Sequence, residues 1–451
     1  MMINRLAGVL RTLWEKVLES TFVRHVGMLT VSNIAGTVLI ILQGVIVARI
    51  LGPTEYGVAG LILSYPSLFI NVLSVGSSEV TLTYLGTYSS EADDEKAVSL
   101  IKLGYLLDML VAVCTILLVG ASAGWAGRNV VKAEGTTWLI VLVALSLLPA
   151  SVVNTSRAVL SFLERFRTIA AIQFLVTLVR SIAIIVFVLL GNGVMGVILG
   201  HILGTLTQVV LYSVFGLRWI RTHWKGSVLR VRIDSLRDDA GSLRQFILFN
   251  SASTVVTSLV KQMDIPLLGF FRNPTEVGYY RLARSIASMV GYLVDPLVSV
   301  AFPRISKLFS EKGIGGLKQL IRRYTTQVSI ALSTGAVVIL PAVPWLIRVI
   351  YGEAFLPSAT PAMFLLIGSI SWLFFFWSRA VHLCIGRVRS WTYGLVVYSF
   401  GILLLDLLLV PQGGFQVMAV IHGVCLFVFH VVMVSRLFLS KEWKNAEPSI
   451  R

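Results

Sequence analysis

Apolar residues along the chain come in long blocks that are separated by short polar segments. Most blocks hold about 20 residues or more, which is the length of a helix that crosses a hydrocarbon core about 30 Å thick. The pattern therefore predicts an all-α polytopic membrane protein with twelve transmembrane helices. The predicted spans are 27–50, 58–86, 98–120, 136–160, 168–190, 193–217, 245–271, 278–303, 325–347, 360–386, 390–410 and 415–438.

Composition agrees with this pattern. The 451 residues are 56% hydrophobic and 13% charged, whereas soluble domains are about 25% charged. A soluble enzyme of this length is therefore excluded. Cys114, Cys384 and Cys425 lie inside apolar blocks and at no metal-binding spacing, and we interpret them as small packing residues.

The basic residues predict the orientation of the spans. The net charge is +16, and in a membrane protein such an excess marks cytoplasmic loops rather than a nucleic-acid partner. With the N-terminus inside, 27 Lys and Arg residues fall in the inner segments and five in the outer loops. We expect a multi-pass protein of the cell membrane with both termini in the cytoplasm.

The polar segments also predict the domain organisation. Residues 1–25 lack the apolar core of a signal peptide and form an amphipathic segment, suited either to a membrane surface or to packing as an ordinary helix on the bundle. Residues 26–217 and 245–438 form two six-helix lobes, joined by the basic cytoplasmic loop 218–244 and followed by a cytoplasmic tail at 439–451. Because each lobe has an even number of spans, the lobes share one topology and form a parallel repeat, as in some secondary transporters.

A short repeat supports this division. "LGPTEYG" (51–57) and "RNPTEVG" (272–278) each join the first and second span of a lobe on the outer side. Gly52 and Asn273 can end one helix in a left-handed conformation, and the following Pro can open the next helix at its first position. We interpret the repeat as two equivalent structural turns.

Polar stripes lie on several predicted spans. A stripe at helical spacing inside the membrane must face a cavity, a partner or another helix rather than lipid. The prolines of several spans, Pro266 in particular, predict bendable helices. The predicted polar face of the cavity consists of Asn71, Ser74, Ser78, Asn250, Thr254 and Thr257.

A cluster of charges surrounds the second turn. Lys261 and Asp264 precede it, and Arg281 and Arg284 follow it. Three positive charges against one negative charge predict an anion site. The alternative is that Lys261 pairs with Asp264 while the arginines extend to the outer headgroups.

Two further charged residues extend this hypothesis. Arg180, near the middle of the fifth span, is a candidate second cationic contact in the first lobe, unless it pairs with a carboxylate. Asp295, together with Asp264, is a candidate for ion coupling or charge balance.

The sequence carries no phosphate loop, metal-ligand cluster or nucleophile motif. The predicted outer loops are short, whereas membrane-bound polysaccharide polymerases and ligases often place their catalytic residues on a large outer loop. We therefore propose no catalytic residue, no metal site and no cofactor, and we expect a transporter rather than an enzyme.

Two stretches resemble a known family. "ARILGPTEYG" (48–57) and "MDIPLLGFFRNPTEVGYYRLA" (263–283) are similar to the turns of the Wzx-type polysaccharide and oligosaccharide flippases of the MOP flippase superfamily. The resemblance implies a V-shaped, two-lobed transporter that acts in lipopolysaccharide, O-antigen or related polysaccharide biosynthesis. It implies an oligosaccharide carried on polyprenyl pyrophosphate, moved from the inner to the outer leaflet by alternating access.

The resemblance also frames the partners and the site. Lys261, Arg281, Arg284 and Arg180 would hold the pyrophosphate by charge-assisted bonds. The partners would be the lipid-linked oligosaccharide and membrane lipids, with no nucleic acid. We expect a monomer, with polysaccharide polymerase or glycosyltransferase machinery as a potential partner.

Two alternatives stay open. A MATE-like multidrug or cation antiporter of the same superfamily would need acidic cavity residues, but residues 27–50 hold no Asp or Glu and the charged cluster is net basic. Asp264 keeps this alternative open, because such antiporters also place a carboxylate on this helix. A polytopic polysaccharide polymerase or ligase fits less well, for the reasons above.

Overall fold

The computed structural model describes residues 21–91, 93–224, 231–440 and 443. Within the helices α2 (Thr21–Leu73), α9 (Ala240–Gln262) and α11 (Pro274–Tyr351), the side chains of some residues also lie outside this description. Among them are Thr257, Lys261 and Asp295. Most of the predicted amphipathic segment 1–25 and of the tail 439–451 likewise falls outside it, as does the centre of the 218–244 loop.

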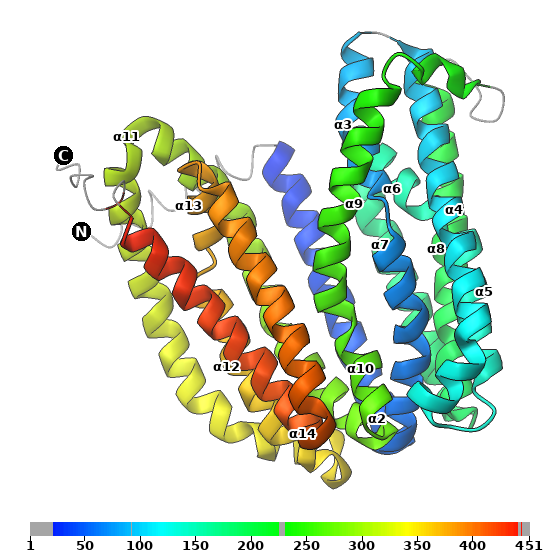
Figure 1. Ribbon diagram of the computed structural model, residues 1–451, viewed down its shortest axis with the longest axis vertical. Coiled ribbons are helices and arrows are strands. Elements are labelled where there is room, and N and C mark those ends of the chain that lie inside the picture. Colours follow the sequence, from blue (N-terminus) through cyan, green and yellow to red (C-terminus); the bar gives the residue numbers. More distant parts are fainter. Residues whose placement is uncertain (1–20, 92, 225–230, 441–442, 444–451) are drawn as a thin grey trace, which may run out of the picture. The chain divides into compact units, whose positions relative to one another are not determined.

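Every regular element in the described part of the chain is helical, and no strand occurs there (Figure 1). The predicted all-α class is therefore confirmed. The α-helices are α2 (Thr21–Leu73), α3 (Ser77–Ser90), α4 (Asp94–Ala126), α5 (Thr137–Ala150), α6 (Val152–Phe162), α7 (Phe166–Leu189), α8 (Gly193–His223), α9 (Ala240–Gln262), α10 (Asp264–Phe271), α11 (Pro274–Tyr351), α12 (Ala359–Phe374), α13 (Ser378–Cys384) and α14 (Val388–Phe438). Shorter turns of helix are η1 (Gly127–Val131), η2 (Ile233–Leu236) and η3 (Glu353–Ser358).

The three longest helices are pairs of helices joined at a glycine. Gly52 in α2, Gly313 in α11 and Gly414 in α14 have non-helical backbone angles with positive φ. Only glycine adopts such a φ without steric cost. Each of these residues lies in one of the polar segments that separate two predicted spans.

The helices are those of a multi-pass membrane protein. Seven helical stretches of the described chain are long and apolar enough to cross a membrane. The longest are Ala35–Ser90, with 56 residues across the junction of α2 and α3, and Val388–Phe438, with 51 residues. The twelve predicted ranges all fall on helical segments or on pairs of them with a short break. The count of twelve spans stays a prediction.

Four predicted spans are interrupted, at residues 74–76, 151, 263 and 375–377. Two of these breaks lie beside candidate site residues. One break covers residues 74–76, between α2 and α3, where Gly76 is left-handed. The other is at Met263, between α9 and α10. Pro266 lies in the first turn of α10, where the N–H that it lacks would have no helical partner. The break thus lies beside the proline that the sequence marks as a bend.

The described residues within 1–44, 73–121 and 141–254 form one compact unit, unit 1. Within it, α6 packs against α3, α7 and α8, and α7 packs along α8. One core cluster joins α3, α4, α6 and α8 to Leu236 and Leu243 of the predicted inter-lobe loop and α9. A second cluster joins α6, α7 and Tyr212 of α8.

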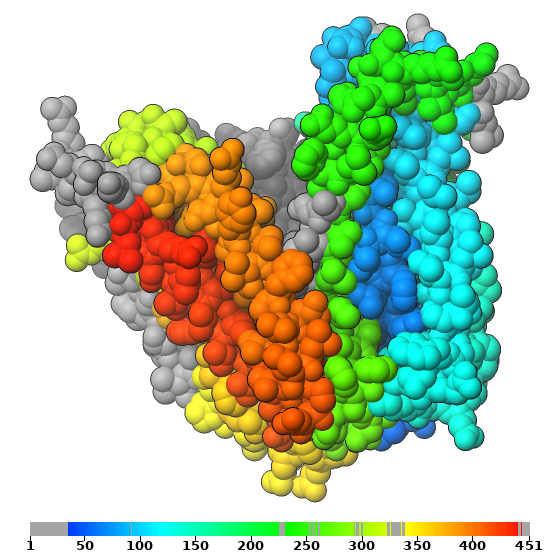
Figure 2. Space-filling model, in the orientation of Figure 1, coloured from blue at the N-terminus to red at the C-terminus, as the bar shows by residue number. Residues whose placement is uncertain are grey.

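The described residues within 45–72, 122–140 and 255–451 form unit 2. Here α12 packs against α11 and α14, and α10 contacts η1, α11 and α14. The two parts of α14, orange and red, lie side by side (Figure 2). Gly368 of α12 and Gly423 of α14 allow backbone contact, because a Cβ at Gly368 would lie 2.6 Å from the Gly423 carbonyl oxygen. The units do not coincide with the predicted lobes, and the division into two six-helix lobes stays a prediction.

Candidate functional site

The two copies of the repeated turn contact each other within unit 2. The hydroxyl oxygens of Thr54 and Thr275 are 2.8 Å apart. A Cβ on Gly57 would collide with the carbonyl of Pro274, and a Cβ on Gly278 would collide with the carbonyl of Pro53. The contact is therefore reciprocal, as it would be about a local two-fold axis that relates the two turns. It leaves no room for a side chain at either glycine.

The helix reversals at the two turns differ in their backbone. Gly52 has φ 69°, as a glycine reversal requires. Asn273 has φ −91° and ψ 162°, so the prediction of a left-handed conformation is wrong at this residue. Asn273 instead caps the start of α11, because its Oδ1 accepts the backbone N–H of Glu276 at 2.9 Å. Pro274 follows at the first helical position, as predicted.

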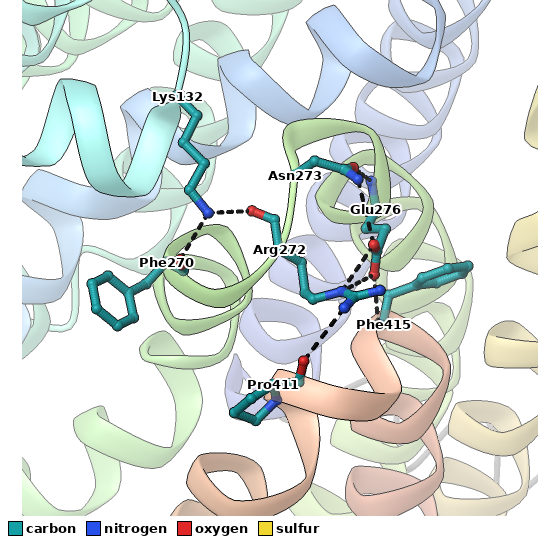
Figure 3. Close-up of polar contacts among 7 residues, drawn as sticks. All are labelled: Lys132, Phe270, Arg272, Asn273, Glu276, Pro411 and Phe415. Atoms are coloured by element: carbon teal, nitrogen blue, oxygen red, sulfur yellow. Dashed lines mark hydrogen bonds and ion pairs between the residues drawn. The ribbon is translucent and has the colours of Figure 1, made fainter.

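The second turn is fixed to its neighbours by a polar network (Figure 3). Arg272 Nε lies 3.0 Å from both carboxylate oxygens of Glu276. Arg272 Nη1 also donates to the carbonyl of Pro411 at 3.3 Å, and the backbone N–H of Phe415 donates to Glu276 at 3.3 Å. The network therefore joins the start of α11 to the kink of α14.

Two basic side chains near the turns donate hydrogen bonds to backbone carbonyls at the C-terminal ends of helices. Lys132 Nζ donates to the carbonyls of Phe270 and Arg272, each at 2.8 Å (Figure 3). Arg49 donates to the carbonyls of Val349 and Ile350 at the end of α11. The last carbonyls of a helix carry a partial negative charge, so these residues have a structural role. Burial, with a smaller contribution from Arg272, lowers the pKa of Lys132.

Asp264 is the centre of the predicted charged cluster. Its side chain is 3% exposed. Arg284 Nη1 donates to its Oδ1 at 2.7 Å, and the hydroxyl of Tyr280 donates to its Oδ2 at 3.1 Å. The backbone N–H of Ile265 adds a further bond at 2.9 Å. The carboxylate is thus held by one cation and two neutral donors, and it fixes Arg284, whose side chain is 36% exposed.

Arg281 has a different environment. Its guanidinium lies 4.4 Å above the ring of Tyr56, and its Nη1 donates to the Tyr56 carbonyl at 2.8 Å. Gly60 makes room for it, since a Cβ there would lie 2.7 Å from Arg281 Cδ. Arg281 therefore joins the second turn to the helix that follows the first turn.

The structure brings Asp264 and Arg284 together and directs Arg281 toward Tyr56. The side chains of Lys261 and Asp295 lie outside the described residues, so their predicted roles stay predictions. Among the described residues, no three His, Cys, Asp or Glu side chains are grouped to hold a metal.

A second buried carboxylate in unit 2 lies near this cluster. His422 Nε2 is 2.9 Å from Asp406 Oδ2, and the His422 ring contacts the Tyr280 ring at 6.2 Å between centroids. Asp406 Oδ1 has no partner among the described residues. The sequence contains both residues but no signal that pairs them, because 16 positions and a helix reversal separate them.

Unit 1 contains Arg180 and part of the predicted polar face. Arg180 packs on Gly204 of α8, and its buried Nε has no hydrogen-bond partner among the described residues. Asn250 lies against Gly76 at the break after Ser74 and donates to its carbonyl at 3.5 Å. Ser78 donates to the carbonyl of Asn154, and Thr254 to that of Asn250. Asn71, in unit 2, bonds within its own helix.

The described end of the 218–244 loop is anchored by Asp239. Lys96 Nζ donates to Asp239 Oδ2 at 3.1 Å, and the Tyr88 hydroxyl donates to the same oxygen at 3.0 Å. The hydrogen bond from Lys96 lowers the pKa of Asp239. This cluster lies on the predicted cytoplasmic side and has a structural role.

The fold is that of the transporters and flippases of the MOP superfamily. An inward-facing multidrug resistance MATE family transporter superposes with a TM-score of 0.67 and 15% identity over 91% of this chain and 96% of its own. The lipid II flippase MurJ in an inward closed conformation superposes with a TM-score of 0.68 and 12% identity, over 91% of this chain and 87% of its own. A mutant of the Vibrio cholerae MATE transporter VcmN superposes with a TM-score of 0.58 and 15% identity, over 94% of this chain and 98% of its own.

Residues 22–309 match the family described as polysaccharide biosynthesis protein. This range is more than half of the chain, and the chain belongs to that family. A search of curated proteins with this chain found no match.

Proposed function

We propose that the protein is an alternating-access flippase that moves an oligosaccharide linked to polyprenyl pyrophosphate from the inner to the outer leaflet of the cell membrane. The observation that carries the proposal is a polysaccharide biosynthesis family match, over residues 22–309, on a chain that has the fold of a lipid II flippase and of MATE transporters. A polar glycan cannot cross hydrocarbon unaided, so its lipid-linked form needs such a carrier.

In this proposal Arg284 binds the pyrophosphate. Asp264, which also accepts a hydrogen bond from Tyr280, holds the Arg284 guanidinium in place, and this lowers the entropic cost of presenting it to an anion. Lys261, two residues before the break at Met263, would add a second positive charge. Asp264 balances the charge of Arg284 when no substrate is bound. Arg281 positions the turn, because its described contacts are with Tyr56.

Arg180 supports an anionic ligand in unit 1. A buried guanidinium nitrogen without a hydrogen-bond partner is costly in a membrane helix, and such intramembrane cations commonly serve function. We propose that Arg180 meets the substrate at a different stage of the cycle. The polar residues Asn71, Ser74, Ser78, Asn250, Thr254 and Thr257 would bond the glycan hydroxyls, and Asp295 would take part in charge balance or ion coupling.

The test is flipping of a fluorescent lipid-linked oligosaccharide by the purified protein in vesicles. Arg284→Gln and Arg180→Gln should each abolish flipping, and a matched exposed change, Arg128→Gln, should not. Mass spectrometry of lipids that co-purify with the wild-type protein should find an acidic polyprenyl lipid. Wild-type flipping by both variants would overturn the anion site.

A MATE-like antiporter is the second candidate, favoured by the fold shared with MATE transporters. The pairing of Asp264 with Arg284 weighs against it, because a cation substrate would compete with a fixed arginine. Extrusion of cationic drugs, without any effect on lipid-linked oligosaccharides, would establish the antiporter instead.

The proposed orientation has its own test. A cysteine introduced at Ser235, in the 218–244 loop, should resist an impermeant reagent in intact cells and react after permeabilisation. Labelling in intact cells would reverse the topology. A cysteine at Glu134, between η1 and α5, should show the opposite pattern.

A further inference from the structure

A buried carboxylate in unit 1 lies at the break between α2 and α3. Asp108 of α4 is 7% exposed. Ser77, the first residue of α3, donates to its Oδ1 at 2.5 Å, and Thr155 of α6 donates to its Oδ2 at 2.8 Å. Both donors are neutral, so the negative charge of Asp108 has no counter-charge among its described partners.

A second hydroxyl points to the same place. Thr81 lies one helical turn after Ser77 and is 0% exposed, and its Oγ1 has no hydrogen-bond partner among the residues that the structure describes. A Cβ built on Gly104 would lie 2.8 Å from Thr155 Oγ1 and 3.0 Å from Thr81 Oγ1. Gly104 is one turn before Asp108 on α4, so both hydroxyls face a position beside the carboxylate that only a glycine leaves open.

We propose that Asp108, Thr81, Thr155 and Ser77 form a sodium-binding site. A hydroxyl has one hydrogen and two lone pairs, so Thr155 and Ser77 can donate to Asp108 and still offer an oxygen to a cation. The Thr81 hydroxyl makes no described hydrogen bond, and a cation could be coordinated by a lone pair of its oxygen. One carboxylate balances one positive charge, which favours a monovalent ion over Ca²⁺ or Mg²⁺, whose protein sites commonly use more carboxylates.

The helix break strengthens the proposal. Transporters often bind ions where a membrane helix is unwound, because free carbonyls and the negative end of the preceding helix face the ion. Here α2 ends at Leu73 and α3 starts at Ser77. Gly76 makes the break possible with φ 64°, and Asn250 bonds its carbonyl.

A purely structural role would leave part of this arrangement unexplained. Asp108 could cap the start of α3, since a negative charge is favourable at a helix N-terminus. A cap does not need Thr81, whose hydroxyl makes no described hydrogen bond, and it does not need the open position at Gly104. These two features distinguish a binding site from a cap.

The test measures the thermal stability of the detergent-purified protein as NaCl replaces choline chloride at constant ionic strength. Sodium should raise the Tm of the wild-type protein in a saturable way, because a ligand that binds only the folded state stabilises it. Asp108→Asn should abolish the response. Thr81→Val should weaken the apparent sodium affinity by about tenfold, the effect expected when one buried ligand is lost.

Matched variants keep the proposal falsifiable where Asp108→Asn does not fold. Thr115→Val on α4 is the control for Thr81→Val, since Thr115 is equally buried but its hydroxyl bonds the Val111 carbonyl at 2.8 Å. Gly104→Ala should fill the site and remove the sodium response. Gly120→Ala on the same helix has open space around it and should keep the response.

Three outcomes would overturn the proposal. The wild-type Tm could be insensitive to sodium, it could respond to pH alone, or the response could survive in Asp108→Asn or in both Thr81→Val and Gly104→Ala. The site goes beyond the proposed flippase function, and the assay needs no substrate. Absence of sodium binding would leave the flippase proposal standing, and absence of flipping would leave the sodium site standing.

Discussion

The two copies of the repeated turn share a contact but differ in their surroundings. Thr54 and Thr275 meet at 2.8 Å, and Gly57 and Gly278 each lie against the opposite proline carbonyl. Glu55 of the first copy is exposed, whereas the side chain of Glu276 is 13% exposed and holds Arg272 and the backbone of Phe415. The residues that the two copies share therefore form the contact between them. The residues that differ around the second copy connect it, and not the first copy, to α14.

The residues that flank the turns differ in charge as well. The equivalent positions are 221 apart. Arg281 corresponds to Gly60, Arg284 to Leu63 and Asp264 to Gln43. Gly60 gives Arg281 its space, so the absence of a side chain in one copy serves a charge in the other. The duplicated frame thus carries the charged set Asp264, Arg281 and Arg284 in the second copy only.

The largest effect is expected at the glycines of the contact. Gly57→Ala and Gly278→Ala each drive a methyl group into a backbone carbonyl, which cannot rotate away. We expect a loss of at least about 3 kcal/mol of stability, seen as low yield and a lowered Tm. Gly86→Ala, with nothing near its Cβ, is the control and should be neutral. Equal stability of all three variants would exclude the contact.

The second prediction separates the charge of the second copy from its frame. Arg284→Gln leaves Asp264 buried without its cation, which should cost about 3–5 kcal/mol, and it should abolish flipping. The double variant Asp264→Asn/Arg284→Gln should recover stability without recovering flipping. Recovery of both stability and flipping in the double variant would show that Arg284 has a structural role alone. Thermal melts and the vesicle assay provide the two measurements.

The third prediction compares the two glutamates at matched positions. Glu276→Gln weakens the bonds to Arg272 and to the N–H of Phe415, and it should destabilise the protein by about 1–3 kcal/mol. Glu55→Gln, at the equivalent exposed position, should stay within about 0.5 kcal/mol of the wild-type protein. Chemical denaturation in detergent measures both values. Similar values for the two variants would mean that the polar network adds no stability.

The smallest effect is expected at the threonine pair. Thr54→Val or Thr275→Val should each cost about 1 kcal/mol, because each removes one partner of the same hydrogen bond. The double variant should cost less than the sum of the two, since the bond is lost only once. Full additivity in a double-mutant cycle would contradict the pairing.

The sequence by itself determined the helical class, the membrane location and the positions of the turns. These depend on local quantities, namely the hydropathy of about 20 consecutive residues and the backbone preferences of Gly and Pro. The all-helical structure and the kinks at Gly52, Gly313 and Gly414 follow from them. Asn273 shows the limit, because both a left-handed residue and a helix cap suit Asn and only the structure distinguishes them.

Only the tertiary structure decided which charges and hydroxyls meet. The sequence places Arg281 and Arg284 on one helix face, yet one contacts Tyr56 and the other Asp264. Asp108 accepts hydrogen bonds from Ser77, 31 positions away, and from Thr155, 47 positions away, and Thr81 lies against Gly104 of the same helix as Asp108. Such contacts depend on how helices cross, which is set by packing summed over many residues and leaves no pattern in any short stretch of the chain.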